Sequence, residues 1–255
     1  MQTTLGQLTD WMNAWAPWDT AEPWDNVGAL VRSSEVVTGV VCCLDITAGA
    51  AAFAAEKGCN TLLSHHPVIF HPLKALAPGQ PAVLAVKAEL NALCAHTNLD
   101  KAPGGVCDLL ARAIGLTGVQ PGQKFCRVGT LPAAVTAAAL ARQVGAALGI
   151  AVQYTRALAD RPVQRVAVVS GAGGDLYDEA LALGAQCLVT GEAGHHDFLD
   201  AAALGLPIIA AGHWGTERLI APELARRVSG AFPGLPVFPY VEPAPAAWFA
   251  GPGEG

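Results

Sequence analysis

The stretch Asn60-Thr61-Leu62-Leu63-Ser64-His65-His66-Pro67 decides the fold of this 255-residue chain, because a short apolar run ends there in two histidines and a proline. A brief apolar run between breaking residues is typical of a buried strand in a parallel sheet, and proline limits continuation of a central strand. The histidine pair therefore follows the carboxyl end of a strand, where open α/β sheets bind their ligands. Successive strand side chains point to opposite faces. Two adjacent imidazoles therefore serve one site only if the backbone turns, or if two metal ions lie side by side.

Composition and charge narrow the class of protein. The chain is 52% hydrophobic and only 14% charged, which is typical of a globular protein with a large core. Its net charge is −6 without a cluster of lysine or arginine, so nucleic acid and anionic membranes are not expected as main partners. No apolar segment reaches the roughly 18 residues of a spanning helix, and the N-terminal residues show no signal-peptide pattern. The seven cysteines include no CxxC pair and predict buried thiols in a reducing compartment, so we expect a cytoplasmic protein.

Predicted strands alternate with predicted helices along the chain, which is typical of α/β folds with parallel or mixed sheets covered on both faces. Gly118, Pro121 and Gly122 interrupt this pattern and place a domain boundary near residue 120. We therefore predict a first α/β lobe of residues 1–120, completed by residues 236–255, and a second α/β lobe of residues 121–235.

The two halves of the chain resemble each other. The block Val40–His66 reads as strand, loop, alanine-rich helix, glycine and strand, and Val166–Glu192 repeats it 126 residues later, with Gly58 falling on Gly184. Repeated units predict two similar α/β lobes with mixed sheets covered by helices, related by a pseudo-twofold axis. Such a duplication would bring the strand ends of both lobes together and place a site between them.

The histidines predict that this site binds metal. At least six of the seven lie just past a predicted strand end, and the spacing His-x₃-acid occurs twice, as His96–Asp100 and His213–Glu217. Imidazole and carboxylate ligands suit zinc, manganese, iron(II), cobalt or nickel. Four or more histidines with two carboxylates exceed one tetrahedral site and fit two divalent ions with a bridging carboxylate or hydroxide. Unrelated surface histidines would not explain the matched positions.

Three other motifs leave alternatives open. The glycines of 171–174 follow a strand and open a helix, so their amides could hold a phosphate, although a tight turn explains them as well. The loop Trp24-Asp25-Asn26-Val27 either packs against the first helix or supports the metal ligands through Asp25 or Asn26. Ser64 next to His65 lacks a nucleophile elbow and does not predict a serine hydrolase.

Five motifs in this order resemble a known family. They are Trp24-Asp25-Asn26-Val27-Gly28, Ser64-His65-His66-Pro67, His96-Thr97-Asn98-Leu99-Asp100, Thr190-Gly191-Glu192 with His195-His196-Asp197, and Gly212-His213-Trp214-Gly215-Thr216-Glu217. Together they resemble the Nif-three-like dinuclear-metal proteins, also labelled GTP cyclohydrolase I type 2 homologues. The resemblance implies two α/β lobes with two metal ions between them, in a ring-shaped homohexamer.

The resemblance also implies roles for particular residues. The metal ligands would be His65, His66, Asp100, His213 and Glu217. Glu217 would bridge the ions, and His96 would lie nearby as a further ligand or hydrogen-bond donor. Glycine and tryptophan at positions 194 and 214 depart from the family pattern, so the substrate stays open.

Three functions fit these expectations. The first is a metal-dependent hydrolase, cyclohydrolase-like or acting on phosphoesters, in which His96 or His195 carries a proton and the substrate is a small molecule such as a nucleotide. The alternatives are a non-enzymatic metal carrier or insertase, and a ring-shaped regulatory scaffold.

Overall fold

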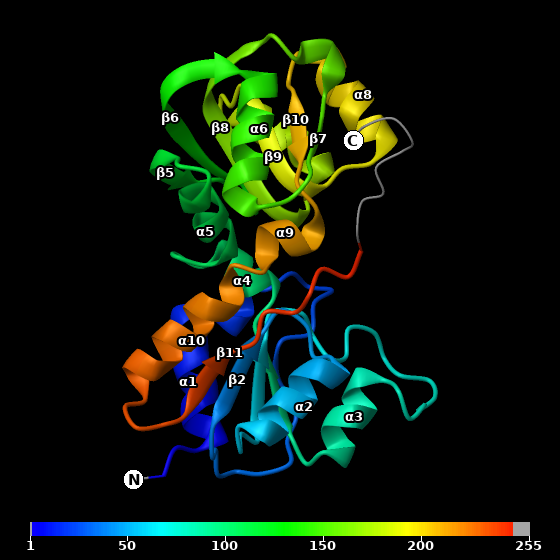
Figure 1. The fold of residues 1–255 in the computed structure, drawn as a ribbon, viewed down its shortest axis with the longest axis vertical. Helices are drawn as coiled ribbons and strands as arrows, with labels where there is room; N and C mark the ends of the chain where they lie inside the picture. Colours follow the sequence, from blue (N-terminus) through cyan, green and yellow to red (C-terminus); the bar gives the residue numbers. More distant parts are fainter. Residues whose placement is uncertain (1, 247–255) are drawn as a thin grey trace. The chain divides into compact units, whose positions relative to one another are not determined.

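The computed structural model describes residues 2–246, which form two units with one sheet each (Figure 1). The first unit comprises residues 2–106 and 218–242, and the second comprises residues 107–217 and 243–246 of the described chain. Residues 247–255, the end of the segment expected to complete the first lobe, lie outside the described residues.

The sheet of the first unit has the strand order β1-β4-β3-β2-β11. Its strands are β1 (Gly28–Val31), β2 (Val40–Cys43), β3 (Thr61–Ser64), β4 (Asn91–Cys94) and β11 (Val237–Pro239). Its helices are α1 (Leu5–Trp15), η1 (Trp18–Thr20), α2 (Ala48–Glu56), α3 (Pro81–Lys87), α4 (Thr97–Lys101) and α10 (Ile220–Ala231). In Figure 1, α2 and α3 lie on one face of this sheet, and α1 and α10 lie on the other.

The sheet of the second unit has the order β5-β6-β8-β9-β10-β7. Its strands are β5 (Thr117–Pro121), β6 (Arg127–Thr136), β7 (Gln153–Tyr154), β8 (Pro162–Ala172), β9 (Cys187–Glu192) and β10 (Ile208–Ala210). Its helices are α5 (Val106–Ala113), α6 (Ala137–Leu148), η2 (Arg156–Leu158), η3 (Gly174–Leu176), α7 (Tyr177–Ala182), α8 (His195–Ala203) and α9 (His213–Glu217). A buried cluster joins α7 and α8 to one face of the sheet, and α6 contacts β6 and β7.

The two units are built alike, which confirms the predicted similarity of the lobes. In each unit three parallel strands are joined by two helices: β2, β3 and β4 by α2 and α3, and β8, β9 and β10 by α7 and α8. An antiparallel edge strand, β1 or β7, pairs with the third strand in the sheet. The repeat extends to a short helix after the third strand, α4 or α9.

Local sequence explains the helix ends in the repeated block. Thr47 caps α2, because its side chain accepts a hydrogen bond from the amide of Ala50. Gly58 and Gly184, which follow α2 and α7, have φ of 66° and 71°, a conformation that glycine adopts without steric cost. The alignment of these two glycines in the sequence repeat thus reflects the same helix ending.

The unit boundaries differ from the predicted ones. Residues 107–120 belong to the second unit, because β5 pairs with β6 in its sheet. The chain returns to the first unit at Arg218, not near residue 236, because α10 packs against β2 and β11. The two helices on either side of this return, α9 and α10, therefore belong to different units.

The seven cysteines are buried free thiols, and burial raises the pKa of Cys42, Cys43 and Cys94 far above the ordinary value of a thiol. They therefore act as core residues and not as nucleophiles. Among the described helices, none has both the length and the apolar character needed to cross a membrane.

Candidate metal centre

The register of the first sheet brings three strand ends to one edge. Cys43 of β2 is aligned with Ser64 of β3, and Ser64 with Cys94 of β4. Because parallel strands in register end at the same edge, the polar residues that follow these ends gather there. These residues are Asp45, His65, His66 and His96.

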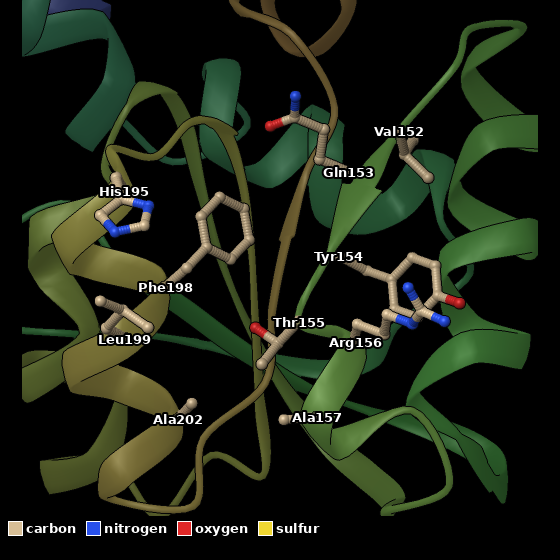
Figure 2. Close-up of a pocket in the computed structure, with 10 residues that line it drawn as sticks. All are labelled: Val152, Gln153, Tyr154, Thr155, Arg156, Ala157, His195, Phe198, Leu199 and Ala202. Atoms are coloured by element: carbon tan, nitrogen blue, oxygen red, sulfur yellow. The ribbon is translucent and has the colours of Figure 1, made fainter.

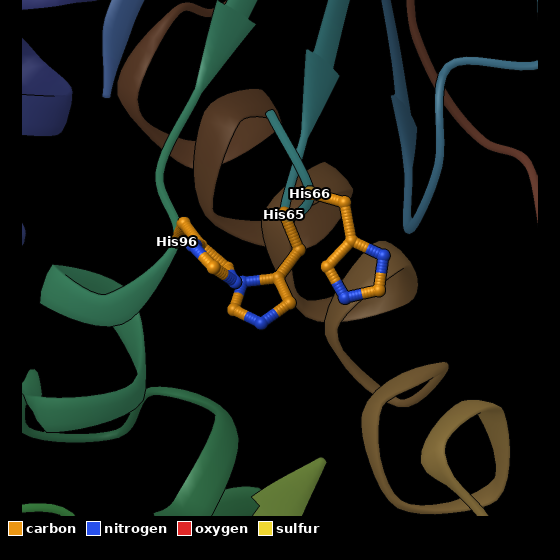
Figure 3. Close-up of side chains that lie close together, drawn as sticks. All are labelled: His65, His66 and His96. Atoms are coloured by element: carbon orange, nitrogen blue, oxygen red, sulfur yellow. The ribbon is translucent and has the colours of Figure 1, made fainter. Parts of the chain in front are cut away.

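The backbone turns at the histidine pair. β3 ends at Ser64, and His65 and His66 lie in bends, with their amides bonded to the carbonyls of Cys43 and Leu44. The two rings lie 5.2 Å apart and are inclined by 37°, instead of pointing to opposite faces. The His96 ring lies 5.2 Å from that of His65, and one ring nitrogen from each of the three lies within 4.8 Å of the others (Figure 3). Of the two sequence alternatives, the turning backbone is therefore confirmed.

An oxygen atom holds Nδ1 of each of these three imidazoles. The acceptors are Ala95 O for His65 (3.0 Å), Asp45 Oδ1 for His66 (2.8 Å) and Asp25 Oδ1 for His96 (2.8 Å). A carbonyl or ionised carboxylate can only accept, so Nδ1 must carry the proton. A neutral imidazole in that tautomer presents a lone pair on Nε2, which is the arrangement found around metal-ligating histidines.

Asp25 holds His96 in a buried network. Its side chain is fully buried and also accepts hydrogen bonds from the amide and hydroxyl of Thr97. Burial by itself raises the pKa of Asp25, but the hydrogen bonds from His96 and Thr97 outweigh burial and hold the pKa well below its usual range. Asp25 is therefore an anion that orients His96, which favours the reading of Trp24–Val27 as a loop that supports the histidines.

The short helix α4 places Asp100 beside these histidines. The amides of Leu99 and Asp100 donate to the carbonyl of His96, and Asn98 accepts from the amide of His96. This turn brings Oδ1 of Asp100 to 3.6 Å from Nε2 of His65. The first unit thus gathers three of the predicted metal ligands (His65, His66 and Asp100) with His96, a predicted catalytic residue.

The second unit gathers the other two predicted ligands. His213 and Glu217 lie at the two ends of α9, with Nε2 of His213 3.0 Å from Oε2 of Glu217. Nδ1 of His213 lies 3.2 Å from Oε2 of Glu192, at the end of β9. This histidine therefore also has an oxygen at Nδ1, and its Nε2 faces the carboxylate of Glu217, the other predicted ligand of this unit.

Two glycines allow α9 to approach the strand ends closely. A Cβ atom at Gly171 would overlap Oε1 of Glu217, and one at Gly191 would lie 3.0 Å from Cα of His213. The amide of Gly171 also donates to Oγ1 of Thr216. The first glycine of the loop at 171–174 therefore packs against the Glu217 side chain, a role that neither sequence alternative included.

His195 lies in a different setting. It begins α8 and lines a groove of about 590 Å³ between α8 and β7, in which it, Phe198 and Leu199 face Tyr154 and Arg156 (Figure 2). None of the potential metal-ligand groups found among residues 2–246 contains His195 or His196.

The supporting carboxylates Asp45 and Glu192 were missed from the sequence. Each is the first charged residue after the start of its strand, β2 or β9, and each accepts from the Nδ1 of a histidine on another segment. An acidic residue at the carboxyl end of a strand, in a chain with histidines at neighbouring strand ends, is the signal that could have identified them.

Comparisons with known proteins identify the family and the fold. The family model described as Duf34/NIF3 (NGG1p interacting factor 3) matches residues 3–242. A Clostridium acetobutylicum protein named GTP cyclohydrolase 1 type 2 homolog is 28% identical over 245 residues, covering 91% of each chain. The fold is similar to that of a Staphylococcus aureus hypothetical protein (TM-score 0.91, 24% identity, 98% of this chain and 100% of that one). It is equally similar to a Bacillus cereus protein related to NIF3 (TM-score 0.90, 20% identity, 98% and 99%). The resemblance seen in the sequence is thus confirmed, and the chain belongs to the Duf34/NIF3 family.

Proposed function

We propose that the protein binds two divalent metal ions through His65, His66, Asp100, His213 and Glu217 and uses them to hydrolyse a small molecule. The observation that carries the proposal is the hydrogen bonding of the histidines at Nδ1. Every one of the four imidazoles at these strand ends has its Nδ1 held by an oxygen, at 2.8–3.2 Å. For His65, His66 and His96 these contacts select the tautomer that binds a metal through Nε2, whereas Nε2 of His213 faces the carboxylate of Glu217.

The donor set supports two ions over one. Three imidazoles and two carboxylates, with His96 as a further nitrogen donor, exceed the four ligands of a tetrahedral site. A carboxylate can bridge two ions, and we assign this role to Glu217, which is buried and held by close packing against Gly171. Nitrogen and oxygen donors of this kind suit zinc, manganese, iron(II), cobalt or nickel.

Bound ions of this kind would lower the pKa of a coordinated water molecule and supply a nucleophile at neutral pH. The chain's own contribution to proton transfer would come from His96. Its Nδ1 is fixed by the Asp25 anion, and its ring lies within 6 Å of those of His65 and His66. The second candidate from the sequence, His195, lines the groove at α8, and the proposal does not depend on it.

The class of reaction is tested by turnover. The relatives named GTP cyclohydrolase 1 type 2 homolog make opening of the guanine ring of GTP the first assay and phosphoester hydrolysis the second. The protein, purified without chelator, is assayed with zinc, manganese or iron(II) restored. We expect turnover that is lost in the double variant His65→Ala, Glu217→Ala and kept in His196→Ala, which removes an exposed imidazole outside the proposed ligand set. Equal rates in wild type and double variant would refute hydrolysis at this site.

A further inference from the structure

Two aromatic side chains next to the histidine cluster (His65, His66 and His96) are unusually exposed. Trp24 is 57% exposed and Phe70 is 40% exposed, although burying either ring would remove a large apolar area from water. Their ring centroids lie 5.8 Å apart, and their planes meet at 68°. Exposed apolar groups that lie together on a surface are typical of binding sites.

His96 completes a three-ring arrangement, which we call the aromatic corner (Trp24, Phe70 and His96). The His96 ring lies 6.3 Å from that of Trp24 and 6.0 Å from that of Phe70, with interplanar angles of 72° and 84°. The planes of each pair of rings are therefore steeply inclined to each other. His96 also belongs to the histidine cluster, so a molecule bound at the aromatic corner would lie beside that cluster.

Polar contacts hold the segment that carries Phe70 and the ring of His96. Asn26 donates from its side-chain amide to the carbonyl of Ile69, the residue before Phe70, and the neighbouring Val68 packs against the core of the first unit. Asp25, between Trp24 and Asn26, fixes His96. The segment Trp24-Asp25-Asn26 thus supplies one ring of the aromatic corner and positions the other two. Binding would therefore lose little side-chain entropy at this surface.

We propose that the aromatic corner binds a flat, uncharged or anionic heteroaromatic ring, such as a purine or pterin, as part of the molecule on which the metal centre acts. This inference rests on the proposed function. Flat rings stack on exposed aromatic faces, and base–aromatic contacts of this kind tolerate different bases. A cationic ligand, which aromatic groups also attract, is disfavoured, because the ions bound by the adjacent histidines would repel it.

The probe for this proposal is 2-aminopurine riboside, whose fluorescence falls when the base stacks, with ribose as the control ligand that lacks the ring. Titrations use the full chain as purified, and metal content is measured on the same samples. We expect binding that Trp24→Leu and Phe70→Leu each weaken by about fivefold or more, the lower range of base–aromatic stacking. The conservative Trp24→Phe and Phe70→Tyr should retain most of the affinity. Tyr154→Leu, which removes an exposed aromatic side chain of the second unit, is the matched control.

The outcomes separate this inference from the proposed function. Normal metal content with no riboside binding, or with equal binding by wild type and both leucine variants, would overturn the aromatic corner and leave the metal proposal standing. Binding that depends on Trp24 and Phe70 in a protein without metal would support the corner and refute the metal centre. If the Trp24→Leu and Phe70→Leu variants change their oligomeric state in ultracentrifugation but keep the riboside affinity of wild type, these rings contact a second copy of the chain. That result would also overturn the inference.

Discussion

Gly171 determines how closely the Glu217 carboxylate approaches the end of β8. A Cβ atom there would overlap Oε1 of Glu217, and the backbone has a φ of 61°, which costs a non-glycine residue roughly 1–2 kcal/mol. We expect Gly171→Ala to lower both stability and bound metal. Gly184→Ala is the control, because its φ is 71° but the nearest atom lies 3.7 Å from the added Cβ. If both variants bind as much metal as wild type, Glu217 is not a ligand.

Asp25 predicts a specific dependence of stability on pH. Because its pKa is lowered in the folded protein, its stabilisation is complete above the unfolded value of 3.8 and is lost as the pH falls below it. Asp25→Ala leaves the Nδ1–H of His96 and the donors of Thr97 unpaired, at a cost of about 3 kcal/mol near neutral pH. Urea unfolding at several pH values should show the difference from wild type shrinking in acid. A difference that is constant with pH would contradict this account, and exposed Asp19→Ala is the control.

At this scale the sequence identifies the histidines at the strand ends better than the carboxylates that hold them. His65, His66 and His96 can be recognised because each follows a strand, and their position at one edge follows from parallel register. Asp45 and Glu192 could not be recognised as partners of His66 and His213. Those pairs span 21 residues each and form only once the strands are aligned.

At the scale of elements, Arg227 of α10 contacts α1, and Glu223 holds this arginine. It accepts hydrogen bonds from Arg226 and Arg227, and the Arg227 guanidinium lies 4.0 Å from the centroid of the Trp15 ring. The hydrogen bond from Arg226 is the main cause that lowers the pKa of Glu223 from 4.5 to about 2. Its stabilisation is therefore present above pH 4.5 and is lost as the pH falls through about 2.

Glu223→Gln should lower the free energy of unfolding at neutral pH by about 1 kcal/mol, a value kept small because water screens the exposed Arg226. The effect should vanish near pH 2, as measured by denaturant unfolding. Glu56→Gln, which removes an exposed carboxylate paired only with the adjacent Lys57 among its described contacts, should change little. Equal losses in both variants at every pH would show that the hydrogen bonds of Glu223 to Arg226 and Arg227 do not stabilise the fold.

The sequence predicts the central elements of each unit and misses the marginal ones. The strands of the repeat are recognisable as short apolar runs, because their side chains are buried on both faces of the sheet. β1 was missed, because two of its four residues are only half-buried. The sequence predicts a domain boundary in place of β5, because Gly118 and Pro121 break its pattern and only pairing with β6 makes it a strand. α4 spans five residues and depends on hydrogen bonds to the carbonyl of His96, which periodicity does not show.

At the scale of the molecule, the second unit takes its whole sheet from one continuous segment of the chain, and the first does not. Strands β5 to β10 and the buried cluster of the second unit all lie within residues 107–217. We expect this segment alone to unfold in one cooperative transition followed by circular dichroism. Residues 2–106 alone should not, because they lack β11 and α10. A disordered 107–217 segment would contradict the division into units. The homohexamer implied by the resemblance stays a prediction, which ultracentrifugation of the full chain tests.

The central claim is that the strand-end histidines and carboxylates bind two ions. The most direct measurement is the molar ratio of metal to protein, by elemental analysis of protein purified without chelator. We predict two divalent ions per chain, with a marked loss in His65→Ala and in Glu217→Ala and no loss in His196→Ala. Zero or one ion per chain in the wild type, or two ions in both ligand variants, would contradict the account.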